Sequence, residues 1–145
     1  MTRPYVDTSA LAKWFFNEVR SESFESFATS QAGLAISTLS VVEFRCLVAR
    51  RQRARLIDAA SASRVIDRFE ELVRRSALMV HPLGPPEFES ALRLIEQLGQ
   101  RYGLRTLDAL HIAGAMAAGA RVFATADAVQ GDAAAAVGLV VESFH

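Results

Sequence analysis

The sequence predicts an α/β fold with a mainly parallel sheet, and two observations lead to this prediction. Short apolar runs alternate along the chain with longer segments in which apolar residues recur at helical spacing. The 145-residue length and the 51% hydrophobic content suit one domain with a substantial core. We therefore expect residues 1–145 to form a single domain in which strands and helices are interleaved.

The first expected strand covers residues 3–6, and a helix begins near Thr8 or Ser9, so that Asp7 stands at the carboxyl end of the strand. The other expected strands are residues 34–37, 78–80, 122–124 and 139–142. The other expected helices are residues 21–30, 40–53, 58–75, 85–102 and 106–118, with a final short helix that ends at Gly138.

Composition narrows the possible functions only slightly. Sixteen basic residues balance sixteen acidic residues, so any attraction to nucleic acid must come from a local patch. A single cysteine, Cys46, excludes an internal disulfide and a thiolate metal site, and its apolar surroundings predict a packed side chain. The chain shows neither a secretion signal nor an apolar run of roughly 18 residues, so we expect a cytoplasmic protein without a membrane partner.

Four acidic residues stand at positions that matter in such a fold. Asp7 and Asp127 follow expected strands, where open α/β sheets bind ligands, and Glu43 and Asp108 lie in the first turns of expected helices. Each residue also has a purely structural interpretation. Acids near helix starts accept hydrogen bonds from free backbone amides, and the helix dipole stabilises their negative charge. Taken singly, each is better explained as a cap than as a ligand.

Taken together, the four acids predict a metal site. Clustered carboxylates repel one another unless a hard cation such as Mg²⁺ or Mn²⁺ neutralises them. Mg²⁺ binds through a few carboxylates together with substrate phosphate oxygens, so a cluster of this kind suits the hydrolysis of phosphodiester bonds.

Four segments around these acids resemble the motifs of PIN-domain nucleases, specifically VapC-like toxins of bacterial type II toxin–antitoxin pairs. The segments are residues 5–11 (YVDTSAL), 37–44 (STLSVVEF), 104–113 (LRTLDALHIA) and 123–127 (FATAD). They occur in the family's order and span nearly the whole chain, and the third is the most specific. One departure is residues 128–132 (AVQGD), where the family usually has basic and apolar residues.

The resemblance implies a five-stranded parallel sheet flanked by helices, and an endoribonuclease that depends on Mg²⁺, with Mn²⁺ as a substitute. Asp7, Asp108 and Asp127 would be the metal ligands, and Glu43 would hold or activate a water molecule. The resemblance also implies RNA as substrate, with tRNA or ribosomal RNA as candidates, together with a VapB-like antitoxin and a homodimer.

Other polar residues near the acids have more than one interpretation. Thr8, Ser9 and Thr125 could hydrogen-bond the carboxylates or a phosphate, or they could simply cap helices. Arg105 could contact the RNA backbone, because it precedes Asp108 by three residues.

Several further side chains are interpreted as structural. The densest basic run, which comprises Arg50, Arg51, Arg53 and Arg55, is best explained as a solvated helix face. His111 could join a mixed metal site, but a packed histidine that shares a face with Leu107 is the stronger interpretation. The aromatic residues of the first two helices belong either to the core or to a groove for a partner; they are Trp14, Phe15, Phe16, Phe24 and Phe27.

Two alternative functions stay open at this point. One is a non-catalytic PIN-fold module that binds nucleic acid or protein and uses its acids as caps. The other is a metal-dependent DNA nuclease of the same fold, because carboxylate chemistry alone does not distinguish ribose from deoxyribose.

Overall fold

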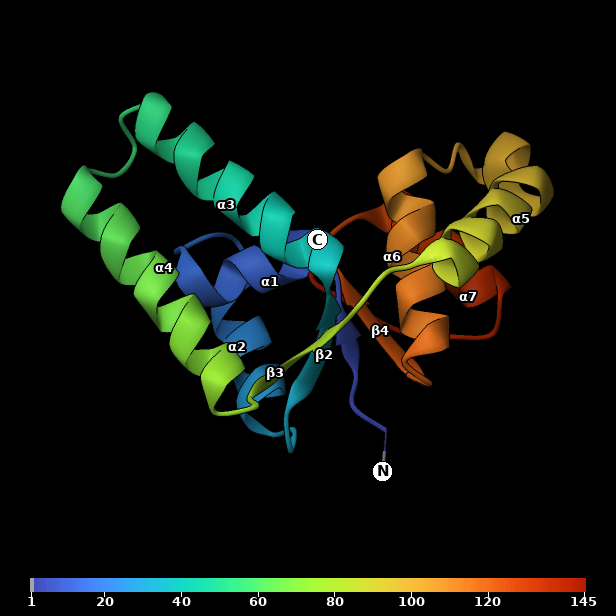
Figure 1. The fold of residues 1–145 in the computed structure, drawn as a ribbon, viewed down its shortest axis with the longest axis horizontal. Coiled ribbons are helices and arrows are strands. Elements are labelled where there is room, and N and C mark those ends of the chain that lie inside the picture. Colours follow the sequence, from blue (N-terminus) through green and yellow to red (C-terminus); the bar gives the residue numbers. More distant parts are fainter. Residues whose placement is uncertain (1) are drawn as a thin grey trace.

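The chain folds into three layers, with a parallel sheet between two groups of helices, in a computed structural model that describes residues 2–145 (Figure 1). The strands are β1 (Tyr5–Val6), β2 (Leu34–Ser37), β3 (Leu78–His81), β4 (Val122–Thr125) and β5 (Val140–Ser143). Their order in the sheet is β3-β2-β1-β4-β5, and every neighbouring pair is parallel. The expected α/β class and the five-stranded parallel sheet are confirmed.

The helices divide between the two faces of the sheet in two consecutive groups. The first group packs on one face and consists of α1 (Thr8–Phe15), α2 (Ser21–Thr29), α3 (Thr38–Arg53) and α4 (Ala59–Arg74). The second group packs on the other face and consists of α5 (Pro85–Tyr102), α6 (Thr106–Ala117) and α7 (Ala128–Ala136). The two groups spread apart like the arms of a V in Figure 1.

Alternation along the strands separates the core into two halves. Tyr5 contributes to the half beneath α5–α7, whereas the adjacent Val6 contributes to the half beneath α1–α4. Phe123 and Ala124 divide in the same way on β4. Successive side chains of a strand point to opposite faces, so a sheet covered on both sides needs apolar residues at every position. The two-residue strand β1 is fully buried for this reason.

The start of α3 differs from the expectation, and its cap explains why. The helix begins at Thr38 rather than at residue 40, and the Ser37 amide at its start donates a hydrogen bond to Ser40 Oγ at 3.2 Å. Glu43 therefore lies in the second turn and plays no part in the cap. Its position cannot be explained by helix capping.

The aromatic side chains between residues 14 and 27 pack in or against the core, and Trp14, Phe15 and Phe16 also line a surface hollow. Phe24 is fully buried, and Trp14, Phe15, Phe16 and Phe27 pack against the half of the core beneath α1–α4. The prediction for Cys46 was wrong, because its thiol is exposed. The core face of α3 carries Ser40, Phe44 and Val48 at four-residue spacing, and Cys46 lies on another face.

The strand order fixes where a ligand can bind. The chain passes from β1 to β2 and β3 on one side of the sheet, and then returns to β4 and β5 on the other side. The neighbouring carboxyl ends of β1 and β4 form the point where the order reverses, which is where open α/β sheets place their binding crevice. Within residues 2–145, none of the helices is both long and apolar enough to cross a bilayer.

Candidate active site

Asp7 lies at this reversal point, buried between β1 and the first turn of α1. Its Oδ1 accepts hydrogen bonds from the Ala10 backbone amide at 2.9 Å and from Ser9 Oγ at 2.7 Å, and its Oδ2 accepts one from Thr125 Oγ1. Burial raises the pKa of the Asp7 carboxyl, while the charge of His111 and these hydrogen bonds oppose the rise. Asp7 thus caps α1, as a structural interpretation requires, and through Thr125 it also joins the carboxyl ends of β1 and β4.

Glu43 reaches the same region from α3 and meets a buried histidine. Its Oε1 accepts hydrogen bonds from Thr8 Oγ1 at 2.8 Å and from His111 Nε2 at 2.5 Å. The other ring nitrogen, Nδ1, lies 2.8 Å from the Tyr5 hydroxyl, which also donates to Ser37 Oγ at 3.0 Å. Burial alone would raise the pKa of Glu43, but the hydrogen bond and charge of His111, together with the Thr8 hydroxyl, lower it overall.

Asp108 and Asp127 share one guanidinium group, that of Arg105. Arg105 Nε donates to Asp108 Oδ2 at 3.0 Å, and Arg105 Nη2 donates to Asp127 Oδ2 at 3.0 Å. The hydrogen bond that Arg105 donates to Asp108 and the charges of both carboxylates raise the pKa of Arg105, whose side chain is nevertheless 72% exposed. Each acid also stabilises a helix start, since Asp108 accepts from the Arg105 amide and Asp127 accepts from the Gln130 amide.

The predicted residues form two hydrogen-bonded groups rather than a ready-made metal cage: one joins Asp7, Asp108 and Asp127, and the other surrounds Glu43. Thr125 connects the two strand ends, because its hydroxyl donates to Asp7 and accepts from the Asp127 amide at 3.0 Å. Among residues 2–145, no three side chains of His, Cys, Asp or Glu are grouped so that they could hold a metal ion. Instead, hydroxyls bind Asp7, the imidazole of His111 binds Oε1 of Glu43, and the Arg105 guanidinium lies between Asp108 and Asp127.

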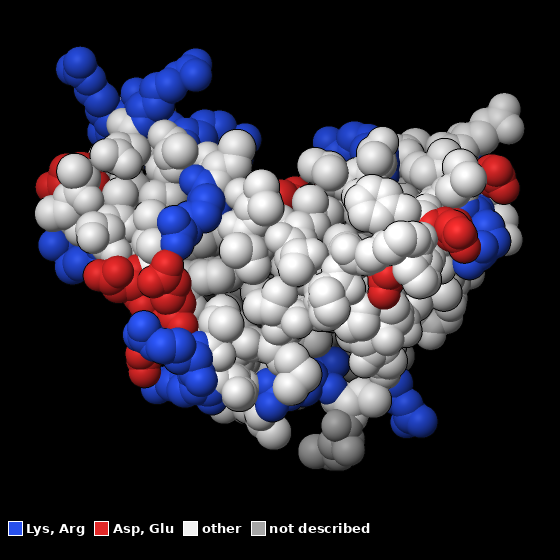
Figure 2. Space-filling model, viewed as in Figure 1, with Lys and Arg blue, Asp and Glu red and all other residues white. Residues whose placement is uncertain are grey.

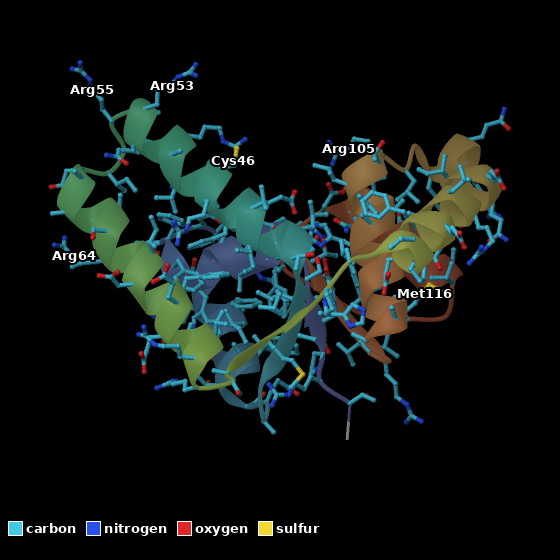
Figure 3. The ribbon with its side chains drawn as sticks, viewed as in Figure 1. Cys46, Arg53, Arg55, Arg64, Arg105 and Met116 are labelled. Atoms are coloured by element: carbon cyan, nitrogen blue, oxygen red, sulfur yellow. The ribbon has the colours of Figure 1, made fainter. Side chains whose placement is uncertain are left out.

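An open cleft of about 540 Å³ adjoins these groups and runs along α3. Thr8, Ser9 and Glu43 line one end of it, whereas Lys13 and Arg50 are also part of its wall. Figure 2 shows the hollow between the two arms of the molecule. Figure 3 shows Arg105 at the amino-terminal end of α6, on the rim that faces α3.

Two residues around the site were interpreted incompletely from the sequence. His111 is buried, as a packed histidine should be, but it also contacts Glu43, and it does not share its surroundings with Leu107, which is 47% exposed. Its place one helical turn after Asp108 was the available signal. Gln130 follows Asp127 at capping-box spacing, but its buried side chain donates instead to the Asp108 carbonyl at 3.4 Å, within the segment that departs from the family pattern.

Several solved structures share this fold. PAE2754 from Pyrobaculum aerophilum is 21% identical, with a TM-score of 0.68 and coverage of 97% of this chain and 83% of that chain. VapC20 from Mycobacterium tuberculosis, a Sarcin-Ricin loop cleaving toxin, is 19% identical, with a TM-score of 0.70 and coverage of 94% and 95%. The DNA-bound VapBC from Salmonella typhimurium is 16% identical, with a TM-score of 0.67 and full coverage of both chains.

At these identities the structural likeness establishes the fold alone. A comparison with curated protein sequences found no match to this chain. The family model of the PIN domain, however, matches residues 5–136 and so includes every acidic residue described above. The chain belongs to the PIN domain family.

Proposed function

We propose that this chain is the toxin of a type II toxin–antitoxin pair and that it hydrolyses RNA with the help of a divalent cation. The observation that carries the proposal is the arrangement of Asp7, Asp108 and Asp127 at the point where the strand order reverses, beside an open cleft. Membership of the PIN domain family and the fold shared with an RNA-cleaving toxin support it.

The donor set suits a hard cation in charge and in atom type. Oxygen atoms of carboxylates and hydroxyls surround the site, and the one cysteine stands apart from any second soft ligand in residues 2–145. Asp108 and Asp127 already share a positive charge, that of Arg105. Asp108 and Asp127 could hold a metal ion in place of the Arg105 guanidinium. Because the Arg105 side chain is exposed, it is free to move away from them.

In the proposed mechanism Asp7, Asp108 and Asp127 would hold Mg²⁺, for which Mn²⁺ could substitute. The bound cation would supply Lewis acidity at the scissile phosphate and would make a water molecule more acidic. Glu43 would orient this water and accept its proton at Oε2, because both hydrogen bonds to Glu43 reach Oε1. Thr8 and His111 both hold the Glu43 carboxylate through Oε1. Ser9 holds Oδ1 of Asp7, and Thr125 holds its Oδ2.

One observation favours a second function, a non-catalytic module of the same fold. All four acids have hydrogen-bond partners within the chain, and Asp108 and Asp127 share the positive charge of Arg105, as a protein without a metal would require. A DNA nuclease would use the same carboxylates. These alternatives are separated by the same assay that tests the proposal.

The assay incubates the purified chain with tRNA, ribosomal RNA and single-stranded DNA, in Mg²⁺, in Mn²⁺ and in EDTA. We expect RNA cleavage that requires a divalent ion and falls at least about 100-fold in D7N and D108N. Asp132→Asn is the matched control, because Asp132 is exposed on α7 and outside the site. Undiminished cleavage in EDTA or in D7N would refute the mechanism, and cleavage of DNA alone would establish the alternative substrate.

The toxin assignment also implies partners, which we propose are a VapB-like antitoxin and a second copy of the chain. Induced expression should stop growth in a host without the antitoxin, and D108N should not. Light scattering on the purified chain should give the mass of a dimer. Normal growth during expression of an active nuclease would remove the toxin role and leave the enzyme.

A further inference from the structure

The face of α3 that begins at Glu43 continues along the cleft toward the end of the helix. Glu43, Cys46, Leu47 and Arg50 all line the cleft, and their spacing of three and four residues places them on one side of α3. Arg50 lies about 10 Å further along the helix axis than Glu43, and Arg53 lies about 15 Å along it. An acidic reaction centre and a basic helix end are therefore parts of one continuous surface.

The arginines at this end of α3 are not occupied by the chain itself. The side chains of Arg50, Arg53 and Arg55 are exposed and make no ion pair or hydrogen bond with any other residue of the described range 2–145. Figure 2 shows basic atoms at the tip of this arm, and Figure 3 places Arg53 and Arg55 there. Arg51 differs, because it pairs with Glu18 and lies over the Phe16 ring at 4.2 Å.

This contrast divides the basic run into one structural arginine and three available ones. Lys13 also lines the cleft, but it donates to the Val19 carbonyl at 2.6 Å and lies 3.6 Å from Glu18. Arg50 is thus the cleft's available cation. A basic run that only keeps the helix solvated would not need to share a cleft with Glu43.

Between its acidic and basic parts the cleft is apolar. Ala12 and Leu47 form part of the wall on one arm, while Leu107, from the start of α6, and Ala126 complete it. Unstacked bases bind apolar walls of this kind, and guanidinium groups bind the phosphates beside them. A duplex keeps its bases stacked inside, so only a single strand can use both features.

We propose that Arg50, Arg53 and Arg55 form a binding track for single-stranded RNA that leads into the acidic site. The inference rests on the proposed function, and it adds the strand's path and its single-stranded form. One phosphate lies at the acids, a base adjoining it contacts Leu47 and Leu107, and following phosphates contact Arg50 and then Arg53. Arg55, just beyond the helix end, extends the track.

The test compares two triple variants that lose the same charge. One replaces Arg50, Arg53 and Arg55 with glutamine, and the control replaces Arg64, Arg75 and Arg121. The control arginines are also exposed, but Arg75 and Arg121 precede β3 and β4 at the amino ends of the strands, and Arg64 lies on the outer side of α4. Binding of a short fluorescein-labelled single-stranded RNA is measured by anisotropy in EDTA, with RNA integrity checked on a gel.

We expect the track variant to bind the RNA about tenfold or more weakly than the natural chain and the control. The slope of log affinity against log salt should fall by about 2, since each lost phosphate contact removes about 0.7 for a single strand. A paired RNA of the same composition should lose less affinity in the track variant than the single strand does, because its bases cannot reach the apolar wall. Circular dichroism confirms that both variants are folded.

Three outcomes would overturn the track. The first is that the control variant loses as much affinity for single-stranded RNA as the track variant does. The second is that the track variant loses as much affinity for paired RNA. The third is that it loses as much affinity for polyglutamate, which would reassign the surface to an acidic protein. If the natural chain binds no RNA at all, the proposed substrate itself is wrong. If the natural chain binds RNA but the track variant and the control variant bind it equally well, the proposed substrate is retained and the track is wrong.

Discussion

Replacement of Arg105 with alanine should strengthen the binding of a divalent cation to the acidic site. The guanidinium makes contacts of 3.0 Å with both Asp108 and Asp127, so a metal that uses these carboxylates must first displace it. Exposed ion pairs contribute about 0.2–1 kcal/mol each, and the 72% exposure of Arg105 places its two contacts in that class. Their combined loss of about 1 kcal/mol corresponds to roughly fivefold tighter binding.

The measurement is a calorimetric titration of Mn²⁺ into the RNA-free protein, which keeps any RNA contact of Arg105 out of the result. Arg101→Ala is the control, because it removes the same charge from an exposed residue at the end of α5. The gain should shrink at high salt, where exposed ion pairs are screened. Unchanged or weaker Mn²⁺ binding in R105A would refute the reasoning and would mean that the arginine supports the carboxylates instead of competing for them.

Three further predictions follow from the contacts around the site and the core. His111→Ala should lower the free energy of unfolding by about 2–4 kcal/mol in urea denaturation, because it empties a buried position and leaves the Tyr5 hydroxyl with Ser37 alone and Glu43 with Thr8 alone, whereas H145A at the exposed terminus should have little effect. Phe44→Ala should lower the free energy of unfolding by about 3–5 kcal/mol in the same measurement, since its ring is fully buried and stacks on the Phe69 ring with 4.6 Å between the centroids. A loss as small as that of F88A, whose side chain is 56% exposed, would contradict the described packing. Alkylation of Cys46, the only thiol, should slow when single-stranded RNA is present, because the residue lines the cleft; an unchanged rate by mass spectrometry would place the RNA elsewhere.

The sequence predicted the layers of the fold well, because every buried strand is an apolar run and every helix has a clear start or stop signal. It located Asp7 and Asp127 at strand ends for the same reason. Helix starts were less certain, and α3 begins two residues before the expected start, because the bond from the Ser37 amide to the Ser40 hydroxyl depends on side-chain geometry that spacing alone does not reveal.

Contacts between distant elements could not be predicted in the same way. His111 meets Glu43 only after α3 and α6 have packed on opposite faces of the sheet, and 68 positions separate the two residues in the chain. Cys46 looked buried because its neighbours in sequence are apolar, but only one face of α3 enters the core. Local pattern thus placed Asp7, Asp108 and Asp127 at strand ends and a helix start, and tertiary packing decided their contacts.

The division of the core into two halves bears on how the site is assembled. Glu43 is anchored in one half and Asp108 in the other, and the two-residue strand β1 lies at the centre of the thin layer between them. A mutation that loosens either half alters the distance between these two acids without touching them. The site needs the two halves of the core to stay correctly aligned, whereas the helices and strands can persist without that alignment. Activity should therefore be lost at a lower temperature than secondary structure when the protein is heated.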